Sequence, residues 1–339
     1  MEGDGRALVV GAGYAGTKHA DALRELGVPF TGPLSARRVM EDPRAFEDPA
    51  FTVVHVCSTN DLHVELAGRA LRAGKDVVCE KPLAVDVGGA EELVALTRQT
   101  GRVAVLAYNY RFHPLVVELA ARAVFLGPLH TARGSFLQDW LLLATDANWR
   151  VEEAHGGASR AIADIGAHWL DLVELVSGER VVAVAAQLGR LHDRGTEDHA
   201  GLLLRFSGGM TGTLVLSQAA AGHRNDMELS LDGSTGSLTW RHERPNELWL
   251  GSRAGDAVVV TRDEDGRTRT RVIIQKRSYL DPGTETFPGE RVGNTGYIEN
   301  PNQRAGSVID NTSAGLLNTQ SALPGPWTLP FKSNPWIGY

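Results

Sequence analysis

The amino-acid sequence predicts an α/β protein: a doubly wound parallel-sheet domain, followed by an α+β domain with a mainly antiparallel, open sheet. Between residues 7 and 107, short apolar strands alternate with helical runs, as in a parallel sheet covered on both faces. After Gly127, alternating runs at residues 201–206 and 211–216 are joined by a glycine turn, which indicates an antiparallel hairpin. With 339 residues, the chain is long enough for both cores.

Composition and charge exclude several classes of protein. The chain is 42% hydrophobic and 22% charged, as in ordinary globular domains. A net charge of -7 without a basic block argues against nucleic acid or an anionic membrane as the main partner. No apolar run approaches the ~20 residues that span a bilayer, and no apolar signal region precedes the first strand. We therefore expect a cytoplasmic protein whose partners are small molecules.

The two cysteines, Cys57 and Cys79, each end a predicted buried strand. They are too few for a disulfide framework in a chain of this size, and they offer too few ligands for a metal site. We expect both to be reduced core thiols, and we expect no metal.

A glycine-rich turn follows the first strand pattern at residues 7–10. The run is Gly11-Ala12-Gly13-Tyr14-Ala15-Gly16, and a helix follows it up to Gly27. Strand, turn and helix in this order predict a Rossmann domain in which these residues hold the pyrophosphate of a dinucleotide. Gly11 permits the tight turn, Gly13 lets the backbone approach the phosphates, and Gly16 lets the helix pack on the sheet. The alternative is a tight turn without a ligand.

The second strand–helix unit is shortened, because only about 25 residues separate Gly27 from the next clear strand at residues 52–56. We place the second strand at residues 28–31 and infer that the third strand, at the sheet edge, is missing. In this register Ser35 stands where an NAD-preferring site has an acid, and Arg37 and Arg38 follow, which suits a 2′-phosphate. The pattern favours NADP, with a solvated arginine face as the alternative.

Lys81 is the first candidate for chemistry. It lies in the turn Glu80-Lys81-Pro82, directly after an apolar strand that ends at Cys79. The carboxyl end of a strand is where open α/β sheets hold their ligands, and the proline fixes the turn. The alternative is a solvated lysine at an ordinary strand end.

The second candidate pair lies in the second domain, on a helix predicted over residues 159–176. Asp164 and His168 are four residues apart and would share a helix face, with Gly166 leaving room for a ligand. A carboxylate beside an imidazole can fix its tautomer and raise its basicity, as a general base requires. The alternative is a surface or capping pair.

These features together resemble the Gfo/Idh/MocA family of NAD(P)-dependent sugar and cyclitol oxidoreductases. The resemblance rests on the glycine turn, the Glu80-Lys81-Pro82 turn, the run from Asn109 to Arg111, Gly156-Gly157, and the run from Asp164 to Asp171. A further run, Gln138-Asp139-Trp140 with Asn148-Trp149-Arg150, is similar to the levoglucosan-dehydrogenase-like branch. Three departures are Thr59, where the family usually has proline, the shortened second unit, and the segment from Lys276 to Tyr339, whose sequence predicts no helix where the family normally has one that returns along the first domain.

The resemblance implies roles for individual residues. Lys81 would contact the reacting oxygen, and Asp164 and His168 would complete the catalytic site. Ribose or nicotinamide contacts are implied for Ser58, Asn60, His63, Glu80 and Asn109. Substrate contacts are interpreted for Arg111, Trp140, Trp149 and Arg150, with packing between the domains as the alternative.

We therefore divide the chain into a cofactor domain at residues 1–113, a substrate and oligomerisation domain at 114–275, and a tail at 276–339. The tail is dense in Gly, Pro, Asn, Ser and Thr, and we expect it to be flexible. We expect a homo-oligomer formed through the C-terminal sheet. The predicted activity is hydride transfer between a sugar or cyclitol hydroxyl and nicotinamide, with His168 or Lys81 taking the proton. The alternative is a catalytically silent, nucleotide-sensing regulator on the same fold.

Overall fold

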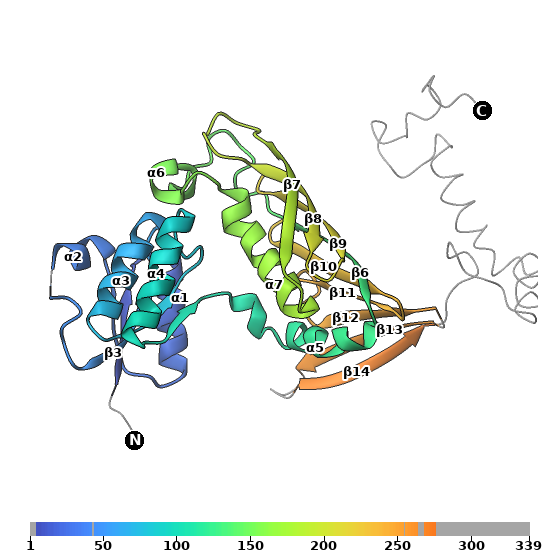
Figure 1. Ribbon diagram of the computed structural model, residues 1–339, viewed down its shortest axis with the longest axis horizontal. Helices are drawn as coiled ribbons and strands as arrows, with labels where there is room; N and C mark the ends of the chain where they lie inside the picture. Colours follow the sequence, from blue (N-terminus) through green and yellow to red (C-terminus); the bar gives the residue numbers. More distant parts are fainter. Residues whose placement is uncertain (1–4, 43, 254, 264–267, 276–339) are drawn as a thin grey trace, which may run out of the picture. The chain divides into compact units, whose positions relative to one another are not determined.

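The computed structural model describes residues 5–42, 44–253, 255–263 and 268–275. These residues form two sheets, called A and B below, with helices packed against each (Figure 1). The predicted tail at residues 276–339 lies outside the described residues. No helix in the described part of the chain is long and apolar enough to cross a membrane.

Sheet A is parallel throughout and has the strand order β2-β1-β3-β4-β5. Its strands are β1 (Arg6–Val10), β2 (Phe30–Leu34), β3 (Phe51–Val56), β4 (Asp76–Cys79) and β5 (Ala104–Leu106). In β1, Leu8 and Val10 pack into one hydrophobic cluster while Ala7 and Val9 pack into another, so the strand is buried on both faces. The predicted Rossmann domain is confirmed.

Four helices connect these strands: α1 (Tyr14–Glu25), α2 (Ala36–Glu41), α3 (His63–Arg72) and α4 (Val87–Thr100). A short 3-10 turn, η1 (Asn60–Leu62), leads into α3. Helix α4 is capped at both ends, because the side chain of Asp86 accepts a hydrogen bond from the Gly89 N–H at its start and Gly101 takes the left-handed conformation at its end.

The second strand begins two residues later than predicted. The N–H of Val28 still donates to the carbonyl of Leu23 at the end of α1, and the register pairs Ala7 of β1 with Phe30. The strand therefore runs on to Leu34, and Ser35 is the first residue after it. Among the described residues between α2 and β3 there is no further strand, so the shortened second unit is confirmed.

Sheet B has nine strands in the order β14-β13-β12-β11-β10-β6-β9-β8-β7. Neighbouring strands are antiparallel except for the parallel pair β6 and β9, as the predicted mainly antiparallel sheet requires. The strands are β6 (Leu129–Leu137), β7 (Val181–Gly189), β8 (His199–Phe206), β9 (Thr211–Ser217), β10 (Asp226–Gly233), β11 (Ser237–Arg241), β12 (Glu247–Ser252), β13 (Gly255–Asp263) and β14 (Thr268–Gln275).

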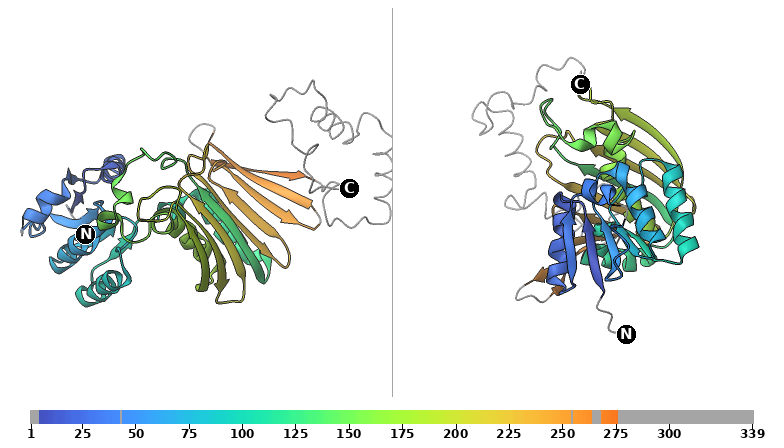
Figure 2. Two further views of the ribbon diagram at one scale, coloured as in Figure 1. Left: turned by 90° about the horizontal axis from the view of Figure 1, so that it is seen from above. Right: turned by 90° about the vertical axis from the view of Figure 1, so that its left-hand side faces the viewer.

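Helices α5 (Pro114–Ala123) and α7 (Ala167–Ser177) cover one face of sheet B (Figure 1). Trp169 of α7, Phe136 of β6 and Trp240 of β11 are fully buried in the core between them. Along β8 the exposure alternates strictly, because one face meets the helices and the other is open. Figure 2 shows the strands of this sheet side by side.

Five short elements lie in the described connections between β5 and β7, and two of them, η4 and η5, contribute residues to the site described below. The five are η2 (Asn109–Phe112), η3 (Val124–Leu126), η4 (Trp149–Val151), α6 (Glu153–Gly156) and a π-helical turn, η5 (Ile162–Gly166). Pro114 is the first residue of α5, a position that suits the fixed φ and missing N–H of proline. We keep a boundary between residues 113 and 114 as a proposal, since α5 packs against α7 and β11 rather than against sheet A.

Candidate active site

A cavity of about 980 Å³ lies where the carboxyl ends of β1, β3 and β4 meet the loops of the second domain. The first domain contributes the glycine turn, the start of α2, the loop after β3 and the turn after β4. The second domain contributes residues that follow β6 and one residue of η5. The lining residues are Gly11, Ala12, Gly13, Tyr14, Ala15, Ser35, Ala36, Cys57, Ser58, Thr59, Asn60, Glu80, Lys81, Gln138, Trp140, Asn148, Trp149, Arg150 and Asp164.

The glycine turn has the geometry that a pyrophosphate needs. Gly11 has a φ of 118°, and a Cβ added there would lie 2.2 Å from the carbonyl oxygen of Cys57. A Cβ at Gly16 would lie 1.7 Å from the carbonyl oxygen of Gly11, so only glycine lets α1 approach the turn. At Gly13, by contrast, a Cβ would meet no atom within 4 Å, and no side chain caps the start of α1. The N–H groups there are available to an anion.

Lys81 and Asp164 form an ion pair across the cavity. The Nζ of Lys81 lies 2.6 Å from Oδ1 of Asp164 and 3.1 Å from its main-chain oxygen. Both side chains are largely shielded, at 12% and 16% exposure. Burial alone would raise the pKa of Asp164, but the charges of Lys81 and Arg150 outweigh it and lower the pKa. Asp164 is therefore a carboxylate that holds the ammonium group in place.

The expected pairing of Asp164 with His168 is wrong. The helix predicted over residues 159–176 begins with the π turn η5, and α7 follows it only from Ala167. Asp164 points its carboxylate at Lys81, and no hydrogen bond joins it to His168 in the described structure.

His168 lies in an aromatic and largely buried environment. Its ring packs edge-on against Tyr108 and Tyr110, with centroids 5.7 and 5.1 Å away, and the side chain is 8% exposed. Nδ1 has no hydrogen-bond partner within the described structure. Burial, reinforced by the charge of Lys81, lowers the pKa of His168 to about 4. The imidazole is thus neutral at neutral pH and able to accept a proton.

The structure brings most of the predicted cofactor residues together. Nine of them line the cavity: Gly11, Gly13, Tyr14, Ala15, Ser35, Ser58, Asn60, Glu80 and Lys81. Gly16 does not line it but packs against the carbonyl oxygen of Gly11. Arg37 and Arg38 are exposed and do not line it, and Arg37 donates to Glu41 at 3.0 Å. Asn109 is exposed at the start of η2, also away from the lining residues.

His63 is completely buried behind the cavity wall. Its Nδ1 lies 2.7 Å from the carbonyl oxygen of Pro82, and its Nε2 lies 3.3 Å from that of Ser58. Burial lowers its pKa despite these two hydrogen bonds. The ring joins the loop after β3 to the turn that carries Lys81, so the structure gives it a positioning task rather than a direct contact.

The predicted substrate residues divide into two groups. Trp140, Trp149 and Arg150 line the cavity. The guanidinium carbon of Arg150 lies 4.4 Å from the ring centroid of Trp149, and Nε of Arg150 lies 3.3 Å from Oδ1 of Asp164. Arg111 instead forms a two-pronged ion pair with Asp171 and does not line the cavity. That contact satisfies the guanidinium of Arg111 and ties η2 to α7.

Sequence reasoning missed two polar side chains at the site. Gln218, which follows β9 and is fully buried, donates to Oδ2 of Asp164 at 2.8 Å. Gln138 accepts from the indole of Trp140 and donates to Asn225, which in turn donates to the hydroxyl of Tyr110. The available signal was a glutamine placed at the end of a strand, where its side chain can reach a site at the sheet edge.

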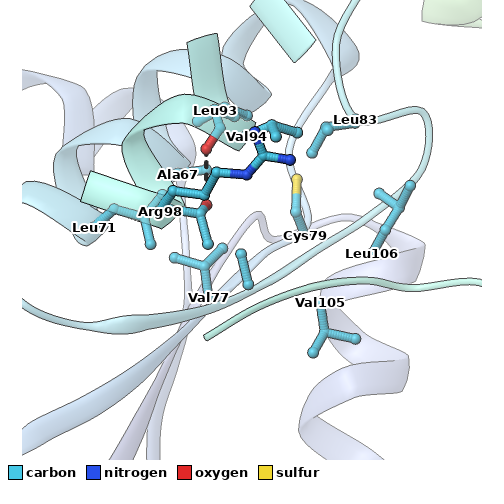
Figure 3. A pocket seen from close by; sticks show the side chains of 12 residues that line it. Ala67, Leu71, Val77, Cys79, Leu83, Leu93, Val94, Arg98, Val105 and Leu106 are labelled. Atoms are coloured by element: carbon cyan, nitrogen blue, oxygen red, sulfur yellow. Dashed lines mark hydrogen bonds between the residues drawn. The ribbon is translucent and has the colours of Figure 1, made fainter. Parts of the chain in front are cut away.

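A second cavity, of about 230 Å³, lies between α3, α4 and the strands β4 and β5. Figure 3 shows that its walls are mainly aliphatic, with side chains such as Leu71, Val77 and Leu106 around the thiol of Cys79. Arg98 is the one charged residue among those that line it, and neither the glycine turn nor Lys81 does so. The larger cavity is therefore the candidate active site.

Comparison with known families places the chain. Residues 33–108 match the oxidoreductase family model with an NAD-binding Rossmann fold, and residues 120–239 match the GFO/IDH/MocA C-terminal domain. The chain belongs to the Gfo/Idh/MocA family. Both of its described sheets carry part of the match.

Curated relatives within the Gfo/Idh/MocA family include levoglucosan dehydrogenase of Pseudarthrobacter phenanthrenivorans. It is 30% identical over 268 residues, which cover 70% of this chain and 66% of the relative. The trans-1,2-dihydrobenzene-1,2-diol dehydrogenase of Mus musculus is 28% identical over 173 residues, half of each chain. The chain thus spans about half to two thirds of the length of these relatives.

Solved structures of Gfo/Idh/MocA type are also similar. An inositol dehydrogenase homologue from Azotobacter vinelandii in complex with NAD+ has a TM-score of 0.67 at 25% identity, over 83% of this chain and 78% of that chain. Levoglucosan dehydrogenase in complex with NADH and levoglucosan has a TM-score of 0.63 at 25% identity, over 80% of each chain.

Proposed function

We propose that the protein is a dehydrogenase that transfers a hydride between a sugar or cyclitol hydroxyl and a nicotinamide dinucleotide. The observation that carries this proposal is the Lys81–Asp164 ion pair inside the cavity that the glycine turn also lines. It sets a shielded cation beside the place where a dinucleotide bound at that turn would end. The solved relatives that bind inositol or levoglucosan support the substrate class.

The cofactor is proposed to lie along the first-domain wall of the cavity. Gly11 and Gly13 would face its pyrophosphate, Ser35 its adenosine ribose, and Ser58 and Glu80 its nicotinamide half. Asn60 would shape this wall, because its side-chain amide donates to the carbonyl of Gly156 at 2.9 Å and ties the cofactor loop to α6. When bound, the nicotinamide ring supplies the hydride acceptor.

The protein's own residues are proposed to stabilise the charge on the substrate oxygen and to take the hydroxyl proton. Two contacts to Asp164 leave Lys81 one ammonium hydrogen, which would donate to the substrate oxygen and stabilise its developing negative charge. His168 is proposed to take the hydroxyl proton because its ring is neutral. The ring does not itself line the cavity and its Nδ1 is buried, so the proposal requires the substrate hydroxyl to reach the ring past Lys81 and Asp164. Asp164 orients Lys81 rather than His168.

The substrate is proposed to lie between Lys81 and the aromatic wall of Trp140 and Trp149. An indole face suits the apolar face of a sugar ring, while Gln138, Asn148 and Arg150 offer polar groups to its hydroxyls. Arg150 is already held by Trp149 and Asp164, so it would bind with little loss of freedom.

The direct test is oxidation of a panel of sugars, anhydrosugars and inositols, followed by the absorbance of the reduced nicotinamide. We expect turnover with at least one of them in the wild type and none in Lys81→Ala. The matched control is Lys75→Ala, because Lys75 is also buried and donates to a carbonyl of the same domain but does not line the cavity. If the protein binds the cofactor but turns over no substrate of the panel, a nucleotide-sensing regulator is favoured instead.

We also propose that the open face of sheet B associates with a second copy of the chain. Apolar side chains stand exposed there on three neighbouring strands: Leu203 of β8 is 62% exposed, Val215 of β9 is 54% exposed, and the exposed Ala185 of β7 pairs with Leu203. A row of this kind on a sheet face is typical of a buried interface. The occupant proposed is the same face of another copy, which is apolar in the same way.

A further inference from the structure

Three hydrogen bonds lead from the substrate wall of the cavity to Tyr110. The indole N–H of Trp140 donates to Oε1 of Gln138 at 2.7 Å, and Nε2 of Gln138 donates to Oδ1 of Asn225 at 2.8 Å. Nδ2 of Asn225 donates to the hydroxyl oxygen of Tyr110, also at 2.8 Å. Trp140 and Gln138 line the cavity, whereas Asn225 and Tyr110 do not. The reaction proposed above assigns no task to Asn225.

The indole of Trp140 sets the direction of all three hydrogen bonds. An indole N–H only donates, so the atom of Gln138 that faces it must be the amide oxygen. The amide nitrogen of Gln138 then faces Asn225, where Oδ1 is the acceptor that it needs. The amide nitrogen of Asn225 is left to donate to Tyr110. Turning over either amide would place two donors face to face, so each amide has one orientation.

Asn225 faces Gln138 because strands β6 and β10 run antiparallel in register. Leu137 pairs with Asp226, the first residue of β10, so the next pair outward consists of Gln138 and Asn225. Side chains at opposite positions of an antiparallel pair lie close enough to interact. The strand register therefore delivers Asn225 to the amide of Gln138.

The main chain of Gln138 is held separately from its side chain. The N–H of Gln138 donates to the carbonyl of Ser217, and the carbonyl of Gln138 accepts from the N–H of Ala220, both at 2.8 Å. The orientation of the Gln138 side chain is thus left for Asn225 to fix. Trp140 depends on it, because the bond to Gln138 is the one hydrogen bond that its side chain makes in the described part of the chain.

Tyr110 gives Asn225 a fixed partner. The ring of Tyr110 packs edge-on against His168, Phe136 and His242, with centroids 5.1, 6.2 and 5.5 Å away. These contacts from three elements determine where the hydroxyl of Tyr110 lies. Asn225 therefore links a ring held by packing to the wall of the cavity.

We propose that Asn225 is a positioning residue that sets which sugars the cavity accepts, because it fixes the indole plane of Trp140 through Gln138. This inference rests on the proposed function, which assigns the indole face to the sugar ring. That face would contact the ring in the ground state and in the transition state alike. A misplaced indole therefore weakens substrate binding without slowing the chemical step.

The test is steady-state kinetics of Asn225→Leu on the sugar panel. Leucine has a similar shape, but it neither accepts from Gln138 nor donates to Tyr110. We expect KM for the best substrate to rise about fivefold to twentyfold, in keeping with the loss of such a hydrogen bond, while kcat stays within about twofold. The ratio of kcat/KM between the best and the next-best substrate should fall, since the wall no longer matches one ring in particular.

Asn225→Asp separates the hydrogen bond from the shape of the side chain. Its carboxylate still accepts from Gln138, and the hydroxyl of Tyr110 can turn to donate to the other oxygen. We expect a KM within about twofold of the wild type. The matched control is Asn246→Leu, the same exchange at an exposed asparagine between β11 and β12 that does not line the cavity, and it should change neither constant.

Hydrogen exchange of the Trp140 indole, followed by NMR, gives a readout that needs no substrate. Its signal is assigned by its absence in Trp140→Phe. We expect exchange to be about tenfold faster in Asn225→Leu than in the wild type, because the acceptor on Gln138 is no longer held. Asn225→Asp should exchange as slowly as the wild type.

An unchanged KM and substrate preference in Asn225→Leu, in a protein that oxidises a sugar, would overturn the inference and leave the proposed function in place. A KM raised as much in Asn225→Asp would overturn it too. If the wild type oxidises no sugar, the proposed function fails, and the indole exchange still decides whether Asn225 holds Trp140. Should Asn225→Leu not fold, Tyr110→Phe removes the partner of Asn225 but keeps the ring, and an unchanged KM there would count against the inference.

Discussion

The side chain of Gln218 donates to Asp164 across 2.8 Å, so the carboxylate that holds Lys81 is itself held from sheet B. Gln218 is fully buried, and the main chain on either side of it continues the pairing of β9. Lys81 thus takes its position from both domains at once.

Gln218→Met should slow turnover about tenfold with a much smaller effect on the Michaelis constant. Methionine fills a similar volume but leaves Oδ2 of Asp164 without its donor, which lets the carboxylate and Lys81 shift. Steady-state kinetics on the proposed substrate would show this, with the exposed Gln187→Met as the control. An unchanged kcat would mean that Lys81 and Arg150 hold Asp164 unaided.

Lys81→Met and Asp164→Asn should each lower kcat/KM by about 10²–10³-fold, and the double variant should be little worse than either. The two side chains act as one unit in the proposed mechanism, because the carboxylate has the task of placing the ammonium group. The measurement is a double-mutant cycle, with cofactor affinity determined separately. Strictly additive losses would show that the two residues act independently.

The pH dependence of kcat/KM for oxidation should follow the protonation of His168. Its lowered pKa means that the ring is deprotonated and competent above about pH 4 and becomes protonated below it, so kcat/KM should fall as the pH drops through about 4. His168→Asn should lower activity and remove the acid limb, whereas a limb that survives in this variant would assign the proton to Lys81.

The predicted preference for NADP stays a prediction. Arg37 must leave Glu41 to reach a 2′-phosphate, and an exposed pair of this kind costs only about 0.5 kcal/mol to break. Glu41→Gln should therefore tighten NADP binding about twofold without affecting NAD, and Arg37→Ala should weaken NADP alone. Cofactor titrations with Arg44→Ala as the surface control would decide the matter, and a clear preference of the wild type for NAD would refute the prediction.

Charged substitutions on the open face of sheet B should lower the oligomeric state. Leu203→Lys places a charge in the centre of the exposed apolar row, and Val215→Glu does so on the adjacent strand. Sedimentation should show smaller particles with unchanged circular dichroism. Exposed Arg205→Glu on the same strand would test whether any charge change has this effect. A wild-type monomer at high concentration would rule the interface out.

The first domain was the more predictable half, because its signals are local. The glycine turn, the capping Asp86 and the placement of Lys81 at a strand end each depend on a few consecutive residues and their backbone geometry. Sheet B was also recognisable from its alternating runs.

The partners of Asp164 were not predictable, because they come from far along the chain. An α-helical spacing favoured His168, but the π turn depends on Glu197, whose side chain accepts from the N–H groups of Arg160 and Ile162. No local pattern announces such a contact between segments about 35 residues apart. The ion pair that holds Arg111 on Asp171, away from the cavity, was not predictable for the same reason, because the two residues lie 60 positions apart.

The contact of Glu197 also limits how this scaffold can be remodelled. Glu197 and the buried Asp198 lie in the loop between β7 and β8, and Asp198 pairs with Arg160 just before the π turn. A loop of that kind is normally the part that can be exchanged to change specificity. Here an exchange would remove the side chains that hold the segment before Asp164. Loops grafted from related proteins should therefore preserve the site only when they keep Glu197 and Asp198.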